Sequence, residues 1–460
     1  MILFTLLLWG ILGISVVNFV IALFTHIIAR PFAASAVRAP VAILKREPSS
    51  DDPFVSVHLA IHDEPPQVVN ATLDALAKLQ YANFEVIILD NNTPDSAVWQ
   101  PVKIYAAELG PQFRFYHFAG VEGAKAGALN IALELSDLRT RFVAVVDADY
   151  QVATDFLSHA LNACDDSVKF AQFPQSYRCA KPAKAVVSEL ADYFETFPRA
   201  ANQAQASLLT GTLSLISVDA LRRVGGWPIH SITEDAELGV TLWTAGERGI
   251  FVDRDGGNGL LPMSLQGLRA QRRRWVTGNV QTLLKNMTRI KRTGRGAVAV
   301  FAQLTAWLGL LALPLTVLIL VATINALPQL QQTGHAPLMM LLEVTAAGTF
   351  IIVLGGHVLR AVIRRRISSL AVTWAMLWTS SFSWFAAFGL TTPQFIRTPK
   401  TQTHRREPMS IDTIGSIVAL AAGVAFFLQG SLVTAVVLGI SAMGLVTAPF
   451  VDRSLRRAAA

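Results

Sequence analysis

Apolar residues are unevenly distributed along this chain, and their distribution limits the folds that it can adopt. Hydrophobic residues make up 52% of the 460 residues. They are concentrated near the N-terminus and in the last third of the chain, whereas residues 50–290 have an ordinary globular composition. We therefore predict one soluble domain carried on membrane-spanning helices.

Five apolar runs are candidates for the membrane crossings. They cover residues 2–29, 297–327, 338–359, 414–429 and 432–450. Lysine and arginine gather after the first, third and fifth runs, at residues 30–46, 360–366 and 452–457. Because cytosolic loops carry an excess of these residues, we expect five crossings, an external N-terminus, a cytosolic C-terminus and a cytosolic soluble domain.

Residues 370–390 form a further apolar segment that is rich in serine, threonine and tryptophan. A sixth crossing here is the alternative, but it would place Arg397 and Lys400 outside, whereas an interfacial or re-entrant helix keeps them cytosolic. Its aromatic residues suit either an interfacial belt or a sugar-binding channel. We predict a first transmembrane helix at residues 1–30 and a cytosolic domain at 50–290. Further transmembrane helices are predicted at 297–363, an interfacial helix with a loop at 367–410, and a transmembrane hairpin at 412–451.

The soluble region alternates strand and helix patterns. Strands are predicted at residues 55–61, 84–89, 113–118 and 142–146, with helices at 67–79 and 123–135. This alternation predicts a mostly parallel, doubly wound, Rossmann-like α/β sheet. Ligands of such sheets bind beyond the carboxyl ends of the strands, and acidic residues lie there, namely Glu64, Asp90, Asp147 and Asp149.

The net charge of +7 does not point to nucleic acid, because the basic residues lie beside the apolar runs. Cys164 and Cys179 are the only cysteines in the sequence. Two cysteines do not make a disulfide framework, and we expect both to be reduced thiols.

Asp147-Ala148-Asp149 follows the apolar run of the fourth predicted strand. Two carboxylates one residue apart at a strand end could hold Mg²⁺ or Mn²⁺, which prefer oxygen ligands and bridge to diphosphates. A diphosphate leaving group needs such a charge, because negative charge builds on it as its bond breaks. The alternative is a solvated turn after a strand.

Glu234 and Asp235 begin a predicted helix, with Thr233 as its N-cap. An acidic pair at this position is also ordinary complementation of the helix dipole. In the functional interpretation, Asp235 is the general base that removes the proton from an acceptor hydroxyl.

Gln271, Arg274 and Trp275 have the i, i+3, i+4 spacing that places residues on one helix face. Arginine binds diphosphates through its planar fork, glutamine can hydrogen-bond them, and the indole offers a flat surface to a sugar ring. The alternative is a basic juxtamembrane helix on anionic headgroups, a role that suits Arg272 and Arg273.

The order of these motifs resembles that of the membrane-integrated family-2 glycosyltransferases, which include cellulose, hyaluronan and related β-glycan synthases. The resemblance implies a GT-A catalytic domain, a nucleotide-sugar donor and Mg²⁺ or Mn²⁺ as cofactor. The implied donor-site residues are Glu64 and Asp90 for uridine and Lys125, Asp147, Gln271 and Arg274 for the diphosphate. The other implied roles are metal binding by Asp149 with Asp147, catalysis by Asp235 with Glu234, acceptor binding by Trp275, and a gating loop that contains Arg397 and Lys400.

Longer phrases resemble proteobacterial periplasmic or cyclic β-glucan synthases of the β-(1,3) and β-(1,6) type, namely Asp90-Asn91-Asn92-Thr93, Gly225-Gly226-Trp227 and the run 233–239. This resemblance implies an inverting, processive transfer of glucose from UDP-glucose to a growing β-glucan, which then crosses the bacterial inner membrane. The implied partners are a UDP-sugar, a glycan acceptor, membrane lipid and export or assembly proteins, and not nucleic acid. The alternatives are a lipid glycosyltransferase that adds one sugar to a ceramide- or diacylglycerol-like acceptor, and a non-catalytic assembly subunit or transporter.

Two departures from the pattern of relatives touch the nucleotide pocket. The sequence has His62-Asp63-Glu64 where relatives usually have Tyr-Asn-Glu, and Asn91 where many have aspartate. They affect the expected base and sugar preference rather than the class of reaction.

Overall fold

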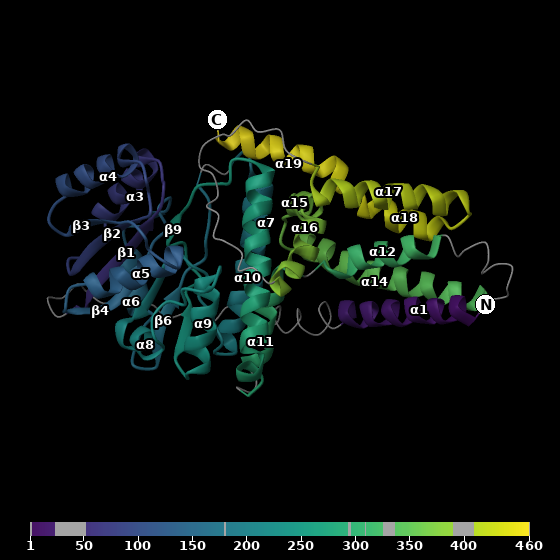
Figure 1. Cartoon of the computed structure of the whole chain (residues 1–460), viewed down its shortest axis with the longest axis horizontal. Helices are drawn as coiled ribbons and strands as arrows, with labels where there is room; N and C mark the ends of the chain where they lie inside the picture. Colours follow the sequence, from purple (N-terminus) through teal and green to yellow (C-terminus); the bar gives the residue numbers. More distant parts are fainter. Residues whose placement is uncertain are drawn as a thin grey trace.

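The structure is a computed structural model that describes residues 2–23, 52–178, 181–292, 296–308, 310–324, 336–389 and 409–459. Figure 1 shows three regions: a sheet domain, two long helices that run across the middle of the molecule, and a bundle of helices at the opposite end. The two middle helices are α7 (Lys184–Gln203) and α10 (Leu265–Arg292). They separate the sheet domain from the bundle.

A seven-stranded sheet forms the centre of the first region, with the strand order β3-β2-β1-β4-β7-β6-β8. The strands are β1 (Phe54–Ile61), β2 (Phe84–Asn91), β3 (Phe113–Phe118), β4 (Thr140–Val145), β6 (Val168–Gln172), β7 (Ser214–Ser217) and β8 (Arg248–Phe251). All pairs are parallel except those of β7, which is antiparallel to both β4 and β6. The predicted, mostly parallel sheet is therefore confirmed.

Helices cover both faces of this sheet (Figure 1). They are α3 (Pro66–Ala77), α4 (Ser96–Glu108), α5 (Ala124–Leu135), α6 (Phe156–Asn162), α8 (Val218–Arg223) and α9 (Glu234–Thr244). Two short strands, β5 (Gln151–Val152) and β9 (Gly257–Asn258), pair in a separate two-stranded sheet.

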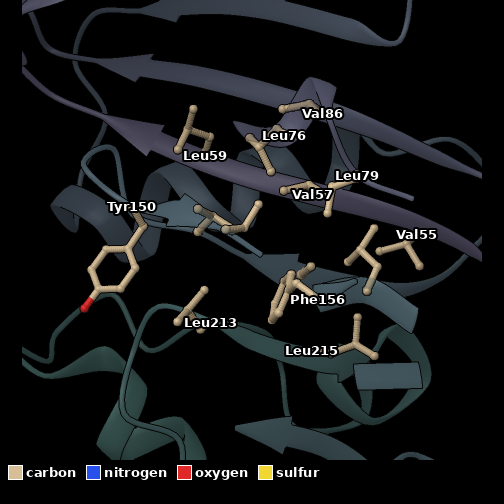
Figure 2. Close-up of a cluster of buried hydrophobic side chains, with 14 of the residues drawn as sticks. Val55, Val57, Leu59, Leu76, Leu79, Val86, Tyr150, Phe156, Leu213 and Leu215 are labelled. Carbon is tan, nitrogen blue, oxygen red and sulfur yellow. The ribbon is translucent and has the colours of Figure 1, made fainter. Parts of the chain in front are cut away.

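The main core lies between the sheet and the helices α3 and α6. Val55, Val57 and Leu59 of β1 are fully buried there, as expected for a central parallel strand. Figure 2 shows Tyr150 at the edge of this cluster, with its hydroxyl directed away from the aliphatic side chains. Cys164 packs against the same core as a free thiol, and burial raises its pKa to about 12.

The bundle contains the apolar helices predicted at the two ends of the chain. They are α1 (Ile2–Leu23), α12 (Ala312–Ile324), α14 (Ala336–Ile363), α17 (Ile411–Leu428), α18 (Leu432–Ser441) and α19 (Gly444–Ala459). Three stretches of the described residues are long and apolar enough to cross a membrane, at Met340–Ile363, Ile411–Leu428 and Leu432–Ala459. These helices fit membrane integration, whereas the number of crossings stays a prediction.

The predicted run 297–327 is not one straight helix. It begins with α11 (Gly296–Thr305) and η2 (Ala306–Leu308), and this part meets α12 at an angle of 55°. The cause is packing, because α11 buries Ala299 and Val300 in a cluster with Trp243 of the sheet domain. Only α12 continues into the bundle (Figure 1).

The segment predicted to be interfacial consists of three short elements, α15 (Ser369–Ala375), α16 (Leu377–Phe382) and η3 (Ser383–Phe388). None of them is long enough to cross a bilayer alone, and their position at a membrane surface stays a prediction. Trp374 and Trp378 are buried, and the Trp374 indole donates to the carbonyl of Ile440 at 2.7 Å. These two tryptophans therefore pack onto the bundle instead of forming an exposed belt.

Ion pairs and hydrogen bonds connect α7 and α10 to the bundle. Asp192 and Glu195 of α7 pair with arginines that follow α14, and Arg269 of α10 pairs with the buried Asp412 at the start of α17. The backbone N–H of Leu265 donates to Asp452 of α19 at 2.9 Å. The position of α10 is thus fixed by contacts with several helices of the bundle.

Candidate active site

A cavity of about 670 Å³ opens beyond the carboxyl ends of β1, β2 and β4, where it is bordered by α9 and α10. Every predicted site residue that the structure describes lines this cavity, except Asp90. The lining includes Glu64, Lys125, Asp147, Asp149, Glu234, Asp235, Gln271, Arg274 and Trp275. Arg397 and Lys400 lie outside the described residues.

Asp235 stands in the first turn of α9 and faces this cavity. Burial raises the pKa of its carboxyl to about 7, and the neighbouring charge of Glu234 adds to the shift. Lys125, the backbone N–H of Ala236 and Arg274 act in the opposite direction. A carboxyl with a pKa near neutrality is suited to accept a proton from an acceptor hydroxyl.

Lys125 lies between the two acidic motifs of the cavity. Its ammonium pairs with Asp147, and its Nζ is 3.7 Å from Oε1 of Glu234. Burial alone would lower the pKa of Lys125, but Asp147 and Glu234 outweigh burial and raise it. The lysine is therefore a fixed positive charge at the place where a diphosphate is expected.

Asp147 and Asp149 present carboxylate oxygens to the same cavity, which suits a hard divalent cation. Asp149 Oδ2 also accepts from the backbone N–H of Leu260 at 3.2 Å. Among the described residues, no group of three His, Cys, Asp or Glu side chains is placed to hold a metal ion. A cation bound by these two carboxylates would therefore need further ligands, which a diphosphate and water can supply.

Thr233 precedes α9, as predicted, but its side chain does not cap the helix. Among the described residues, its buried hydroxyl has no hydrogen-bond partner, although it lies in the cavity wall. The reason is packing, because Gly278 of α10 faces Thr233 so closely that a Cβ at Gly278 would overlap its side chain. The hydroxyl oxygen of Thr233 is therefore buried against α10 without a hydrogen bond to the helix that it precedes.

The predicted face of α10 lines the cavity through Gln271, Arg274 and Trp275. Gln271 Oε1 accepts a hydrogen bond of 3.3 Å from the hydroxyl of Tyr177. Arg273 is exposed, but Arg272 is only 1% exposed and pairs with Glu189. A headgroup contact for Arg272 is therefore excluded, because α7 and the bundle cover this side of the helix.

Asp90 is the predicted residue that the structure does not bring to the cavity wall. It is 1% exposed and accepts hydrogen bonds from Thr93 and from His117, each at 2.6 Å. Burial raises the pKa of Asp90, while these two hydrogen bonds oppose the shift. Asn91 and Asn92, which follow it, line the cavity instead.

His62, which the sequence placed at the nucleotide pocket, lines the cavity, whereas Gln175, Tyr177 and the loop 229–232 are lining residues that were not predicted. The ring Nδ1 of His62 donates to the carbonyl of Asn91 at 2.6 Å. Gln175 and Tyr177 follow the carboxyl end of β6, so the rule that identified Asp147 would also have found them had β6 been recognised. The loop 229–232 does not directly follow a strand, so this rule would not have identified it.

Two smaller cavities lie between the first one and the bundle, and neighbouring cavities share wall residues. The second, of about 50 Å³, shares Thr210, Thr233, Asp235 and Trp275 with the first. The third, of about 80 Å³, shares Tyr193 and Trp307 with the second. The rings of Tyr193 and Trp307 are stacked with centroids 4.5 Å apart, so an aromatic wall runs along this series.

Most of the chain matches models of known protein families. Residues 142–428 match the model described as glycosyl transferase family group 2, and residues 56–225 match glycosyl transferase family 2. A probable glucomannan 4-β-mannosyltransferase of Arabidopsis thaliana is 26% identical over 272 residues, which cover 52% of this chain and 49% of that protein. The UDP-forming cellulose synthase catalytic subunit of Xanthomonas axonopodis pv. citri is 27% identical over 240 residues, which cover 50% of this chain and 32% of that protein.

The chain spans about half the length, or less, of these curated relatives. Among solved structures, it is similar to a mannosyltransferase of Pyrobaculum calidifontis in complex with GDP-mannose and Mn²⁺. That similarity has a TM-score of 0.52 at 19% identity and covers 75% of this chain and 98% of the other. It confirms the predicted GT-A fold.

Proposed function

The chain belongs to glycosyl transferase family group 2, and we propose that it transfers a sugar, with inversion, from a nucleotide-sugar to a glycan acceptor. The observation that carries this proposal is the arrangement of Asp235, Lys125 and Arg274 around one cavity. It combines a carboxyl with a pKa of about 7 and two cationic side chains. A base and a diphosphate site are the two parts that such a transfer requires.

In the proposed reaction, Asp235 takes the proton from an acceptor hydroxyl. The oxygen attacks the anomeric carbon opposite the leaving group, through a transition state with oxocarbenium character. The bond to the diphosphate breaks, its electron pair leaves with the nucleoside diphosphate, and an α-linked donor gives a β-linked product. Lys125, Gln271 and Arg274 are proposed to bind the diphosphate, while Glu64 is proposed to contact the nucleoside.

Asp149 and Asp147 would hold Mg²⁺ or Mn²⁺, which would neutralise charge on the departing diphosphate. The carboxylate oxygens in the cavity suit these ions. The Pyrobaculum mannosyltransferase that shares the fold is described as a complex with Mn²⁺.

We propose that the acceptor is a growing polysaccharide. The aromatic wall formed by Trp275, Trp307 and Tyr193 supports this, since it extends from the base toward the bundle through consecutive cavities. Sugar rings bind readily to such flat apolar faces, and several cavities in series suit a chain better than a single sugar. The product would pass outward through the bundle, with export or assembly proteins and membrane lipid as partners.

UDP-glucose is the proposed donor and a β-glucan, linked β-1,3 or β-1,6, is the proposed product, on the strength of the motif resemblance. The names of relatives include both a cellulose synthase and glucomannan mannosyltransferases, so mannose donors belong in the same test. The motif resemblance favours the bacterial inner membrane, and the basic residues beside the apolar helices favour a cytosolic catalytic domain.

The second candidate is a lipid glycosyltransferase that adds one sugar to a ceramide- or diacylglycerol-like acceptor. It would share the donor site and Asp235, and the third cavity, which lies among the helices of the bundle, is where its acceptor is proposed to bind. Product size separates the two functions, because one gives a polymer and the other a single glycolipid.

The decisive experiment incubates the purified chain, in lipid nanodiscs with Mg²⁺ or Mn²⁺, with radiolabelled UDP-glucose and GDP-mannose. A long product that a β-glucanase cuts supports the proposal, and a small organic-extractable product favours the lipid acceptor. Asp235→Asn should abolish transfer and retain UDP binding, while Asp155→Asn, at a partly exposed position outside the cavity, is the control. Absence of transfer from every donor would overturn the catalytic assignment.

A further inference from the structure

Arg272 is only 1% exposed and is among the largest side chains in the described part of the protein that are buried to this extent. Its guanidinium donates to Oε2 of Glu189 on α7 at 2.7 Å. Within the same described residues, its Nε and Nη1 atoms have no hydrogen-bond acceptor. The carboxylate of Glu189 is therefore its one hydrogen-bond acceptor among the described residues. A single acceptor offsets only part of the free energy that it costs to remove a guanidinium from water.

The rest of the guanidinium surface is occupied by two indoles. Its central carbon lies 4.7 Å from the ring centroid of Trp275 and 3.6 Å from that of Trp307. The two rings are themselves 5.4 Å apart and tilted by 39°. The planar cation thus contacts both rings at cation–π distance.

These two indoles are the ones that line consecutive cavities. Trp275 lines the first and second cavities, and Trp307 lines the second and third. Arg272 lines none of these three cavities. It therefore touches the aromatic wall without contributing to the surface that a ligand would meet.

Stability alone does not explain a charge at this position, because buried ion pairs can often be replaced by apolar side chains without loss of stability. A flexible methionine would fill the space between the indoles, but it would not define their planes. A guanidinium that Glu189 holds in place does define them, since it is planar and its interaction with each ring depends on orientation.

We infer that Arg272, held by Glu189, is a positioning residue that sets the indoles of Trp275 and Trp307 as the platform for the acceptor. This inference rests on the proposed glycosyl transfer and adds to it a residue that acts without touching substrate. It also predicts a separation of effects. Binding of the acceptor depends on the pair Arg272–Glu189, whereas binding and slow hydrolysis of the donor do not.

The test compares Arg272→Met, Glu189→Gln and Arg272→Lys with wild type, using the donor on which wild type is active and soluble β-linked oligosaccharides as acceptors. Arg272→Met should lower kcat/KM for the acceptor about 100-fold, because small misplacements of a binding surface are costly. Hydrolysis of the donor without acceptor should change less than about twofold. Arg272→Lys keeps the charge but not the planar group. Its kcat/KM for the acceptor should therefore lie between those of wild type and Arg272→Met.

Arg273→Met is the matched control, since this neighbouring arginine is exposed on the same helix, and it should behave as wild type. Unchanged acceptor kinetics in Arg272→Met, or an equal loss of transfer and of donor hydrolysis, would overturn the inference. If Arg272→Met does not fold, Arg272→Lys and Glu189→Gln still test whether acceptor kinetics change while donor hydrolysis does not. A wild type without transfer activity refutes the proposed function instead, so the two failures are distinguishable.

Discussion

Gly211 leaves open the space that the carboxylate of Asp235 uses: a Cβ built on Gly211 would lie 3.1 Å from Asp235 Oδ2. The same atom would be 3.6 Å from the side-chain nitrogen of Gln175. Gly211 also has a φ of +100°, which L side chains rarely adopt. The loop before β7 is therefore shaped around the proposed base on α9.

Replacing Gly211 with alanine should impair catalysis more than folding. The added methyl group would press on Asp235, and kcat/KM should fall about 10- to 100-fold, because a displaced base loses its alignment with the acceptor hydroxyl. Initial rates at saturating donor, together with UDP affinity from calorimetry, measure the effect. UDP affinity should stay close to that of wild type.

The matched control is Gly225→Ala. Gly225 has a similar φ of +87°, but a Cβ at this position would meet no atom of the described residues within 4 Å. It should show the same backbone strain, about 1–2 kcal/mol of unfolding free energy, with normal kcat/KM. An equal loss of activity in both variants would show that strain, and not the contact with Asp235, is responsible.

The pH dependence of transfer should report the ionisation of Asp235. Its pKa of about 7 means that the carboxyl is largely protonated, and unable to act as a base, at lower pH. We therefore expect kcat/KM to rise with pH and to level off above about pH 7, with a tenfold fall per unit on the acid side. A profile that is flat across this range would contradict the role of Asp235.

Glu234→Gln should move the acid limb of this profile to lower pH. The negative charge of Glu234 contributes to the raised pKa of Asp235, so its removal makes Asp235 easier to ionise. Lys125→Met should move the limb in the opposite direction, because the charge of Lys125 lowers the same pKa. Two shifts of the same sign would show that these residues act through folding and not through Asp235.

The sequence predicted the parts of the molecule that depend on local patterns. The strands β1 to β4 are apolar runs that end in acidic or turn residues, and the i, i+3, i+4 spacing placed Gln271, Arg274 and Trp275 in one cavity. The short strands β6, β7 and β8 were missed, because runs of four or five residues carry little periodicity.

The remaining differences arise from contacts between residues far apart in the chain. Asp90 is withdrawn from the cavity by His117, and Arg272 is withdrawn from the surface of α10 by Glu189 and Trp307. The bend between α11 and α12 likewise follows from packing on Trp243. Hydropathy does not distinguish an apolar side chain that faces lipid from one that faces protein, so the run 297–327 gave no sign of this bend.

Transfer should depend on a divalent cation that Asp149 helps to bind. Removal of metal by a chelator should abolish activity, and Mn²⁺ or Mg²⁺ should restore it, because carboxylate oxygens suit both ions. Asp149→Asn should lower kcat about 100-fold at a saturating metal concentration, since charge on the departing diphosphate is then less well neutralised. It should also raise the Mn²⁺ concentration that gives half-maximal activity.

Asp155→Asn is the control for this experiment as well, because Asp155 pairs with His159 and Arg254 at a position outside the cavity. It should keep the metal dependence of wild type. Metal-independent transfer by the wild type would mean that Lys125 and Arg274 neutralise the diphosphate without an ion. In that case, Asp149→Asn should leave kcat unchanged, and the assignment of Asp147 and Asp149 as metal ligands would be wrong.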